Sequence, residues 1–170
     1  LVPFDTLFDD RLPDADGLFI GGGFPESHLV ALESNVSLRQ QLRDAIDGGL
    51  PAYAECGGLM YLARTLSWRG EKRKMVGIID ADAVMHDRPQ GRGYTRLRET
   101  GDGPWSASGP DRREIAAHEF HYASLENLGG EPTYAYEVLR GTGVDHRHDG
   151  IVYKNLLAGF AHLRDTGSHH

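Results

Sequence analysis

The sequence predicts an α/β domain, and three observations lead to that class. In the first third, short apolar runs alternate with segments whose apolar residues recur every three to four positions. Glycine-rich turns separate these runs from the periodic segments, as where a buried strand leads into a helix. The later part alternates apolar and polar residues in the manner of strands. We therefore expect a mostly parallel sheet with helices on both faces and a partly antiparallel second half.

The first strand is expected over residues 16–20, an apolar run that ends at the three glycines of residues 21–23. Pro25 suits the first turn of the helix that follows, and Glu26 is favourable at the positive end of that helix. Apolar residues at 29–32 give this helix a stripe that can face a core. The segment is therefore interpreted as a strand–turn–helix unit.

A second helix is expected over residues 37–47, with Ser37 as its N-cap and apolar positions close to a 3.6-residue period. The glycines at 48–49 end it. Residues 50–54 form the next apolar run and so a second buried strand. Residues 59–66 follow as a helix with apolar side chains on one face. Two such units in succession favour a parallel sheet with right-handed crossovers.

The rest of the chain is expected to add strands to one domain over residues 1–170. No internal repeat occurs in the sequence. Residues 102–111 are rich in Gly, Pro and Ser and are expected to form a loop. Further strands are expected within residues 75–85, 94–98, 114–125, 133–139 and 151–163.

The composition is that of a globular domain and disfavours two classes of partner. Of the 170 residues, 39% are hydrophobic and 25% are charged. The net charge is −7, whereas a nucleic-acid-binding domain usually carries a basic surface. No apolar run approaches the roughly 20 residues that span a bilayer. We therefore expect neither a nucleic acid nor a membrane as partner.

The cysteine count and the chain ends bear on compartment and completeness. Cys56 is the one cysteine, so an internal disulfide is excluded, which fits a reducing cytoplasm. Residues 1–8 lack the charged start and long apolar stretch of a signal peptide. Because the first residue is Leu rather than Met, the sequence is interpreted as a fragment or an excised domain. Residues 167–170, Gly-Ser-His-His, are either native or part of a tag and receive no functional role.

Residues 54–58, Ala-Glu-Cys-Gly-Gly, carry the strongest chemical signal in the chain. They have the form small-x-nucleophile-x-Gly between a strand and a helix, with Ala54 in place of the usual first glycine. This form is typical of an elbow that holds a nucleophile on a sharp turn. The following helix is expected to lower the pKa of the Cys56 thiol, although a basic partner is still needed. The pattern disfavours the alternative of a buried, inert cysteine.

The glycine turn at residues 21–23 offers a second part of an acyl-transfer site. Its N–H groups can point into a site at the carboxyl end of the sheet. It is neither a P-loop nor a dinucleotide-binding turn, because no Gly-Lys-Ser/Thr follows and position 26 is Glu. We expect Gly22 and Gly23 to supply one oxyanion donor and the N–H of Gly57 the other. The alternative is a flexible turn without a role.

The general base has to come from nine histidines. His162 ends an apolar segment, and a strand-end histidine can reach an elbow across the same sheet edge, so it is one candidate among rivals. His118 and His121 do not match the zinc motif H-E-x-x-H and would face opposite sides of a strand. His146 and His148 have no recognised metal spacing and are most simply part of a solvated loop.

Five motifs stand in order along the chain and together carry a family resemblance. They are GGGFPE at residues 21–26, AECGGLMYL at 54–62, GRGY at 91–94, HEFHY at 118–122 and FAHL at 160–163. With them the chain resembles the C-terminal glutamine amidotransferase domain of the cobyrinic acid a,c-diamide synthases over almost its whole length. The resemblance implies a flavodoxin-like class I glutamine amidotransferase fold. It also implies that this fold's first strand and helix, and the family's N-terminal ATP-binding synthetase domain, are absent from the chain.

The resemblance implies a glutaminase. Cys56 would attack the amide of L-glutamine to form a glutamyl thioester, and His162 would relay the proton. Gly22, Gly23 and Gly57 would hold the oxyanion, and ammonia would travel to the synthetase domain. That domain would use ATP and Mg²⁺ to amidate the a and c acetate side chains of cobyrinic or hydrogenobyrinic acid, corrinoid tetrapyrroles of cobalamin biosynthesis. No cofactor or metal is expected in this domain itself.

The chain departs from related triad amidotransferases, which carry Glu two residues after the histidine, because it has Arg164 there. We therefore expect a Cys–His dyad, with Asp165 as a remote substitute. The resemblance supplies further candidates for glutamine binding or for contact with the synthetase domain. These candidates are Arg92, Tyr94, His118, Glu119, His121 and Tyr122.

Other functions stay open on the sequence. The acceptor of an amidase of this kind could be another tetrapyrrole, such as sirohydrochlorin or sirohaem, and cobyric acid synthase is a more distant relative with the same chemistry. A glutaminase-like fold kept as a non-catalytic binding or dimerisation module is a contrasting alternative, against which the presence of Cys56 and His162 argues. A cysteine peptidase or hydrolase on the same kind of fold is a third. A homodimer also stays open.

Overall fold

The computed structural model describes residues 1–106 and 112–163. Arg164, Asp165, the Gly-Ser-His-His end at 167–170 and residues 107–111 of the predicted loop at 102–111 lie outside the described residues.

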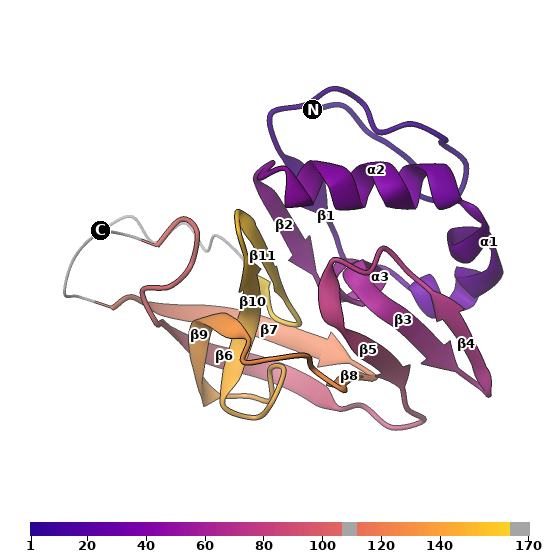
Figure 1. The fold of residues 1–170 in the computed structure, drawn as a ribbon. Coiled ribbons are helices and arrows are strands. Elements are labelled where there is room, and N and C mark those ends of the chain that lie inside the picture. The colour runs from indigo at the N-terminus through magenta and orange to yellow at the C-terminus, as the bar shows by residue number, and fades with distance from the viewer. Residues whose placement is uncertain (107–111, 164–170) are drawn as a thin grey trace.

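Strands and short helices alternate in the first third of the chain, and strands make up the rest (Figure 1). The elements are β1 (Leu18–Ile20), the 3-10 helix η1 (Pro25–His28), α1 (Leu29–Ser34), α2 (Val36–Asp47), β2 (Ala52–Glu55), α3 (Gly57–Leu62), β3 (Ala63–Trp68), β4 (Glu71–Lys74), β5 (Ile79–Met85), β6 (Gly91–Glu99), β7 (Glu114–His121), β8 (Ala123–Glu126), β9 (Thr133–Arg140), β10 (His148–Tyr153), β11 (Leu156–Gly159) and β12 (His162–Leu163).

The strands form two mixed sheets, which confirms the α/β class. The larger sheet has the order β1-β2-β11-β10-β9-β6-β7-β12, and the smaller has the order β4-β3-β5-β8. Parallel pairing joins β1 to β2, β2 to β11 and β3 to β5, while the other neighbours are antiparallel. The antiparallel part is thus larger than the sequence suggested. Tight connections such as residues 154–155 between β10 and β11 account for part of it, because they permit only an antiparallel return.

The helices cover one face of the parallel strands rather than both. Buried residues of α1, α2 and α3 pack in a single core with Leu18 and Ile20 of β1, whereas Phe19, on the opposite face, is 63% exposed. In Figure 1 the helices accordingly gather beside β1, β2 and β3, away from β6 and β9. The reason is topological. Strands β1, β2 and β11 succeed one another in one direction, and right-handed crossovers between them place their connections on the same face.

Helix α2 agrees with its predicted span, but its cap differs. Leu38, Leu42 and Ile46 are fully buried, as the period of the pattern required. The N-cap is Asn35 rather than Ser37, because the Asn35 side chain accepts a hydrogen bond from the Leu38 N–H at 3.3 Å. The Ser37 hydroxyl instead donates to a carbonyl of the N-terminal segment.

The helix expected over residues 59–66 ends early, at Leu62, and the chain continues as strand β3. Leu62, Ala63 and Leu66 are buried, but Ala63 already has extended backbone angles. Pairing with β5 sets Thr65 opposite Asp82. A tertiary pairing has therefore overridden a helical pattern. The charged edge strand β4 was also not predicted, since it shows little alternation.

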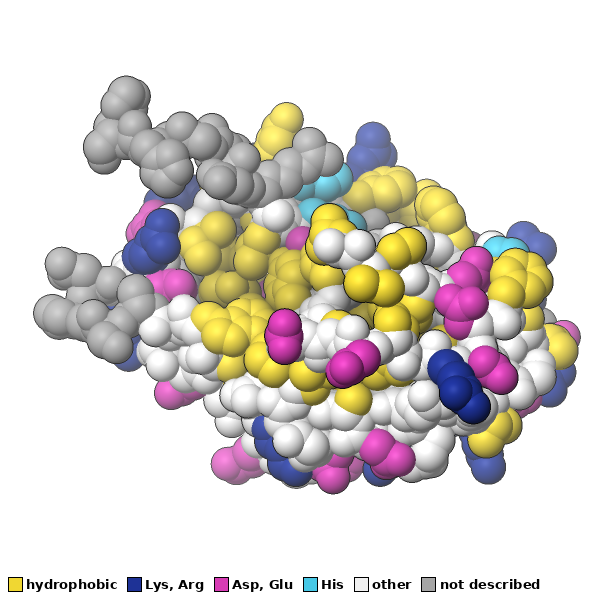
Figure 2. Space-filling model, turned by 90° about the horizontal axis from the view of Figure 1, so that it is seen from above, with side chains coloured by type: hydrophobic (Ala, Val, Ile, Leu, Met, Phe, Trp, Pro, Cys, Tyr) yellow, Lys and Arg dark blue, Asp and Glu magenta, His cyan; other side chains and the backbone are white. Residues whose placement is uncertain are grey.

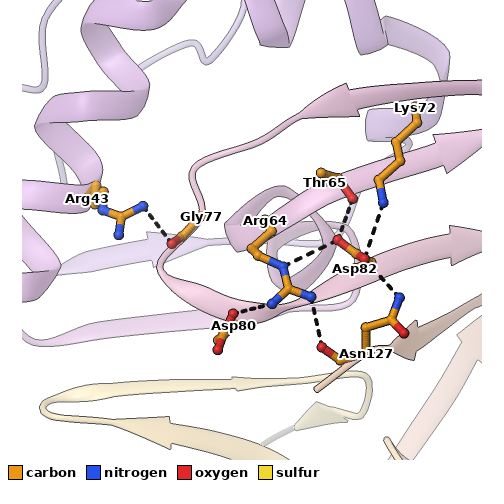
Figure 3. A network of polar contacts seen from close by, with 8 residues as sticks. All are labelled: Arg43, Arg64, Thr65, Lys72, Gly77, Asp80, Asp82 and Asn127. Atoms are coloured by element: carbon orange, nitrogen blue, oxygen red, sulfur yellow. Dashed lines mark hydrogen bonds and ion pairs between the residues drawn. The ribbon is translucent and has the colours of Figure 1, made fainter. Parts of the chain in front are cut away.

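A buried carboxylate, Asp82 of β5, anchors the smaller sheet (Figure 3). It accepts hydrogen bonds from Thr65 of β3 at 2.7 Å, from Asn127 after β8 at 3.0 Å and from Lys72 of β4 at 3.2 Å. Arg64 adds a longer ion pair. Burial alone would raise the pKa of Asp82, but these partners outweigh it and lower that pKa.

Two arginines extend this network at its rim (Figure 3). Arg64 pairs with Asp80 and donates to the backbone carbonyl of Asn127 at 2.8 Å. Arg43 of α2 donates to the Gly77 carbonyl at 2.8 Å, in the segment that leads into β5. The network therefore ties the helical layer to all four strands of the smaller sheet.

Several large apolar side chains remain on the surface. Figure 2 shows hydrophobic side chains gathered on the face seen from above, with histidines among them. Phe19, Phe24, Tyr94 and Phe120 are among the large exposed hydrophobic residues. Within the described residues, no helix is long and apolar enough to cross a membrane.

Candidate active site

The predicted nucleophile elbow is present at Cys56, between β2 and α3. Cys56 has φ 47° and ψ −101°, a backbone conformation that residues other than glycine rarely adopt and that stores strain. Its N–H donates to the Gly159 carbonyl of β11 at 2.8 Å, and its carbonyl accepts from the Met60 N–H at 3.1 Å. Because hydrogen bonds on both sides fix this residue, the elbow holds the sulfur in one place.

The two glycines after the cysteine permit close backbone approach. A Cβ at Gly58 would lie 2.2 Å from the Ile20 carbonyl oxygen, and a Cβ at Gly57 would lie 2.5 Å from the Gly23 carbonyl oxygen. Helix α3 therefore rests directly on β1 and on the glycine turn. Ala54, in place of the usual first glycine, is fully buried and fits without difficulty.

The glycine turn, the cysteine and His162 meet at Gly22. A Cβ at Gly22 would lie 2.9 Å from the Cε1 atom of His162 and 3.9 Å from the Cβ atom of Cys56. Gly23 in turn contacts Gly57. The structure thus brings together the five residues predicted to have catalytic or oxyanion roles, Cys56, His162, Gly22, Gly23 and Gly57.

The thiol of Cys56 is not activated by the elbow alone. Its pKa is raised to about 11, chiefly by burial and to a smaller extent by the nearby carboxylates of Glu26 and Glu55, and the hydrogen bond from the Gly57 N–H opposes this rise only in part. The expected lowering by the helix is therefore outweighed by burial. The Sγ–H group donates to the Phe120 carbonyl at 3.8 Å. Ionisation consequently needs a base close by.

A buried carboxylate, Asp149, fixes the turn that precedes His162. Both oxygens of Asp149 accept hydrogen bonds from the backbone of the preceding turn, from the Phe160 N–H at 3.0 Å and the Ala161 N–H at 2.8 Å. Strand β12 pairs with β7 so that His162 lies opposite His118, with ring centroids 6.5 Å apart. The position of the base therefore depends on a long-range antiparallel pair.

Glu55, directly before the nucleophile, was missed by the sequence analysis. It is only 9% exposed, and its Oε2 atom lies 3.1 Å from the Nδ1 atom of His162. Its Oε1 atom accepts hydrogen bonds from the Tyr53 hydroxyl at 2.7 Å and from the Leu163 N–H at 3.1 Å. A charged residue at the end of a buried strand was the signal available for finding it.

The HEFHY motif divides between the two sides of β7, as its alternation predicted. Glu119 and His121 point inward and are 2% and 4% exposed. Glu119 accepts from the N–H groups of Thr142 and Gly143, at 2.8 and 3.0 Å. The His121 ring stacks on Phe160 with centroids 3.9 Å apart. These two side chains therefore support the backbone beneath the site instead of lining its entrance.

The other candidates lie on the outer side of the same strands. Tyr94 is exposed and meets His118 edge-on, with ring centroids 6.0 Å apart. Arg92 is exposed and stands opposite Phe120 in the β6–β7 register, and Tyr122 packs edge-on against Phe120. This set places a cation and aromatic rings beside His162, where a substrate could contact them.

A cavity of about 350 Å³ adjoins the glycine turn. Gly22, Gly23 and Gly57 line it together with residues 4–7, but Cys56 and His162 do not. It therefore flanks the reactive pair without containing it. Within the described residues, no three His, Cys, Asp or Glu side chains are grouped so that they could hold a metal ion.

The similarity of this chain to known proteins agrees with the fold and with the Cys56–His162 site described above. Residues 1–167 match the family model of the CobB/CobQ-like glutamine amidotransferase domain. A cobyrinate a,c-diamide synthase of Magnetococcus marinus is 44% identical over 99% of this chain, and one of Archaeoglobus fulgidus is 41% identical over 96%. The chain spans 35% of the length of each relative.

Solved structures support the fold. The structure described as PurLQS from Thermotoga maritima superposes with a TM-score of 0.67 over 91% of this chain and 71% of its own, at 14% identity. A structure described as a glutamine amidotransferase gives 0.60 over 86% of this chain and 70% of its own, also at 14% identity. At that identity the likeness concerns the fold alone. The fold, the elbow with its histidine and the family match together place this chain in the family of CobB/CobQ-like glutamine amidotransferase domains.

Proposed function

We propose that this chain is a glutaminase that releases ammonia from L-glutamine through a thioester on Cys56. The observation that carries the proposal is the convergence at Gly22, where a built Cβ would lie 2.9 Å from the His162 ring and 3.9 Å from the Cys56 Cβ atom. A nucleophile, a base and glycine N–H groups at one point are what acyl transfer requires.

The reaction follows from these positions. The Cys56 sulfur attacks the side-chain amide carbon of glutamine while its proton passes to Nε2 of His162. The N–H of Gly57 and those of the glycine turn stabilise the oxyanion. The carbon–nitrogen bond then breaks, and His162 returns the proton to the nitrogen, which leaves as ammonia. Water, deprotonated by His162, hydrolyses the thioester to glutamate and restores the thiol.

Glutamate release by the natural full-length protein tests this proposal. We expect Cys56→Ala and His162→Ala each to lower kcat by at least about 10³-fold, because each removes a group that acts in the covalent step. His148→Ala is the control, since that histidine pairs with Asp145 and not with the site. Activity that survives Cys56→Ala would refute the proposal.

Arg92 is proposed to bind the α-carboxylate of glutamine. It is exposed and stands opposite Phe120, whose carbonyl touches the Cys56 thiol. Loss of a charge-assisted contact costs about 1.5–3 kcal/mol, so Arg92→Ala should raise KM roughly tenfold or more with little change in kcat. Steady-state kinetics with Arg92→Lys as the charge-preserving comparison measure this. An unchanged KM rejects the role.

For the whole protein we propose amidation of the a and c acetate groups of cobyrinic or hydrogenobyrinic acid, with the ammonia made here. The names of the relatives support that acceptor. ATP and Mg²⁺ would bind in a synthetase domain outside this chain. Incubation of the full-length protein with glutamine, ATP, Mg²⁺ and the acid should give a diamide by mass spectrometry. Amidation of sirohydrochlorin or sirohaem instead would replace this acceptor and leave the glutaminase intact.

A further inference from the structure

We propose that Glu55 is the acid partner of His162, so that the dyad expected from the sequence is a triad whose acid directly precedes the nucleophile. In this role Glu55 is a positioning residue, because it touches His162 and no reacting atom. The inference rests on the proposed glutaminase function and deepens it.

The contact between Glu55 and His162 fixes where the imidazole ring carries its proton. Oε2 of Glu55 lies 3.1 Å from Nδ1 of His162. A carboxylate only accepts, so this contact requires the proton on Nδ1. The neutral ring then leaves Nε2 unprotonated and ready to receive the thiol proton. Glu55 therefore selects the tautomer that the reaction needs.

The carboxylate of Glu55 is itself held in place by two hydrogen-bond donors. The Tyr53 hydroxyl and the Leu163 N–H both donate to Oε1 of Glu55, at 2.7 and 3.1 Å. Burial and the hydrogen bond to Glu55 raise the pKa of Tyr53, so this hydroxyl remains a donor at neutral pH. Because Leu163 follows His162, Glu55 holds the ring and the backbone of β12 together.

The backbone of the elbow directs Glu55 toward His162. Along β2, Ala52 and Ala54 belong to the core that the helices build, whereas Tyr53, like Leu163, packs against a second buried cluster under the antiparallel strands. Glu55 lies on the same side of β2 as Tyr53 and therefore falls on the side of β12. The left-handed conformation of Cys56 then turns the chain, so that both the acid and the nucleophile approach the same histidine. An acid two residues after His162, where related amidotransferases carry Glu, is not needed in this arrangement.

Glu55 acts on the reaction through the proton that passes from Cys56 to His162. When Cys56 gives its proton to Nε2 of His162, the ring becomes a cation, and the negative charge of Glu55 stabilises it at Nδ1. The same proton leaves with the amide nitrogen as ammonia. No proton is transferred to Glu55 in these steps, and no other reactant is required.

Kinetics of the natural full-length protein provide the first test. We expect Glu55→Gln to lower kcat for glutamate release by roughly 10²- to 10⁴-fold with KM changed by less than about threefold, because charge and tautomer control are lost without loss of a substrate contact. Glu55→Asp should recover part of kcat. Tyr53→Phe is the intermediate variant, because Tyr53 helps to fix the carboxylate. It removes one bond to the carboxylate but leaves the carboxylate against His162, so its loss in kcat should stay below about tenfold.

A spectroscopic readout separates positioning from general support of the fold. In protein labelled with ¹⁵N-histidine and assigned by His162→Gln, neutral His162 should carry its proton on Nδ1. In Glu55→Ala a substantial fraction should shift to the Nε2–H tautomer. Retention of the Nδ1–H tautomer, together with kcat within about threefold of wild type in folded Glu55→Gln and Glu55→Ala, would overturn the inference.

The experiments distinguish failure of the proposed glutaminase function from failure of the proposed role of Glu55. If Cys56→Ala is inactive while the Glu55 variants remain active, the glutaminase stands and the role of Glu55 falls. If the wild-type protein releases no glutamate, the proposed function falls, and the tautomer of His162 in Glu55→Ala still decides whether Glu55 controls that ring.

Discussion

Cys56 combines a strained backbone with a thiol that burial makes a weak acid. Its φ of 47° is maintained by bonds to β11 and α3, and burial raises the thiol pKa to about 11. The strained backbone fixes the position of the sulfur atom but does not convert the thiol to a thiolate. Reactivity must therefore come from His162 when substrate is present.

The raised pKa predicts how the free protein reacts with an alkylating reagent. Below a pKa of about 11 the thiolate fraction changes tenfold for each pH unit. The rate at which iodoacetamide modifies Cys56 should thus rise about tenfold between pH 8 and pH 9. A fast rate that is flat from pH 6 to pH 9 would instead mean that a thiolate–imidazolium pair already exists in the free protein.

Alanine substitutions at Gly22 and Gly23 distinguish the steric requirement at each position from the role of its backbone N–H group. A Cβ at Gly22 would meet His162 at 2.9 Å, whereas a Cβ at Gly23 would meet nothing within 4 Å. Both N–H groups survive substitution by alanine. Gly22→Ala should displace His162 and lower kcat by at least about tenfold, since small misplacements of catalytic groups are costly. Gly23→Ala should lose markedly less, and equal losses for the two variants would contradict the geometry.

At the scale of elements, local pattern and long-range pairing compete. The α2 pattern agrees with the structure because its buried face needs only helical spacing. The pattern at 59–66 failed beyond Leu62, because β5 and its buried Asp82 hold the following residues in an extended strand. Apolar residues at 62, 63 and 66 fit a helix and a strand equally, so sequence alone could not decide.

The Asp82 network makes a prediction about the stability of the smaller sheet. Asp82→Asn leaves buried donors imperfectly paired, so it should reduce the free energy of unfolding by about 1–3 kcal/mol. Because the folded-state pKa of Asp82 is lowered, the stabilisation is complete above its unfolded pKa of about 3.9 and disappears as pH falls through the folded-state value.

Urea titrations of wild type and Asp82→Asn at several pH values measure this difference. The difference in the free energy of unfolding between wild type and Asp82→Asn should be largest near neutral pH and should decrease below about pH 4. Glu126→Gln, an exposed change on the neighbouring strand β8, is the control and should leave stability nearly unchanged. A difference in the free energy of unfolding that increases as the pH is lowered would contradict the assigned charge state of Asp82.

The site was predictable to the extent that it depends on parallel strand ends. Ends of neighbouring parallel strands meet at one sheet edge, so the glycine turn after β1 and the elbow after β2 were expected together. His162 reaches Glu55 because β11, which ends three residues before it, pairs in parallel with β2 and sets Gly159 opposite Glu55, while β12 is held against β7. Both registers join residues more than 40 positions apart in the sequence, and no local pattern specifies them.

For the whole molecule, the reactive groups lie where the two cores adjoin. The helices and the smaller sheet build one core, while Leu97, Tyr136 and Leu157 belong to the second, under the antiparallel strands. Cys56 stands at the end of the first, and Leu163, next to His162, packs against the second. The relative placement of base and nucleophile therefore depends on both halves folding together.

The most direct test of the account is to treat the full-length protein with a glutamine-mimicking diazo ketone and to map the adduct by mass spectrometry. The reagent alkylates a cysteine that sits in a glutamine pocket. Excess glutamine serves as competitor and Cys56→Ala as control. We expect an adduct that is confined to Cys56 within this chain, is suppressed by glutamine and is absent from the variant. Labelling that glutamine does not suppress, or an unlabelled Cys56 in folded protein, would contradict it.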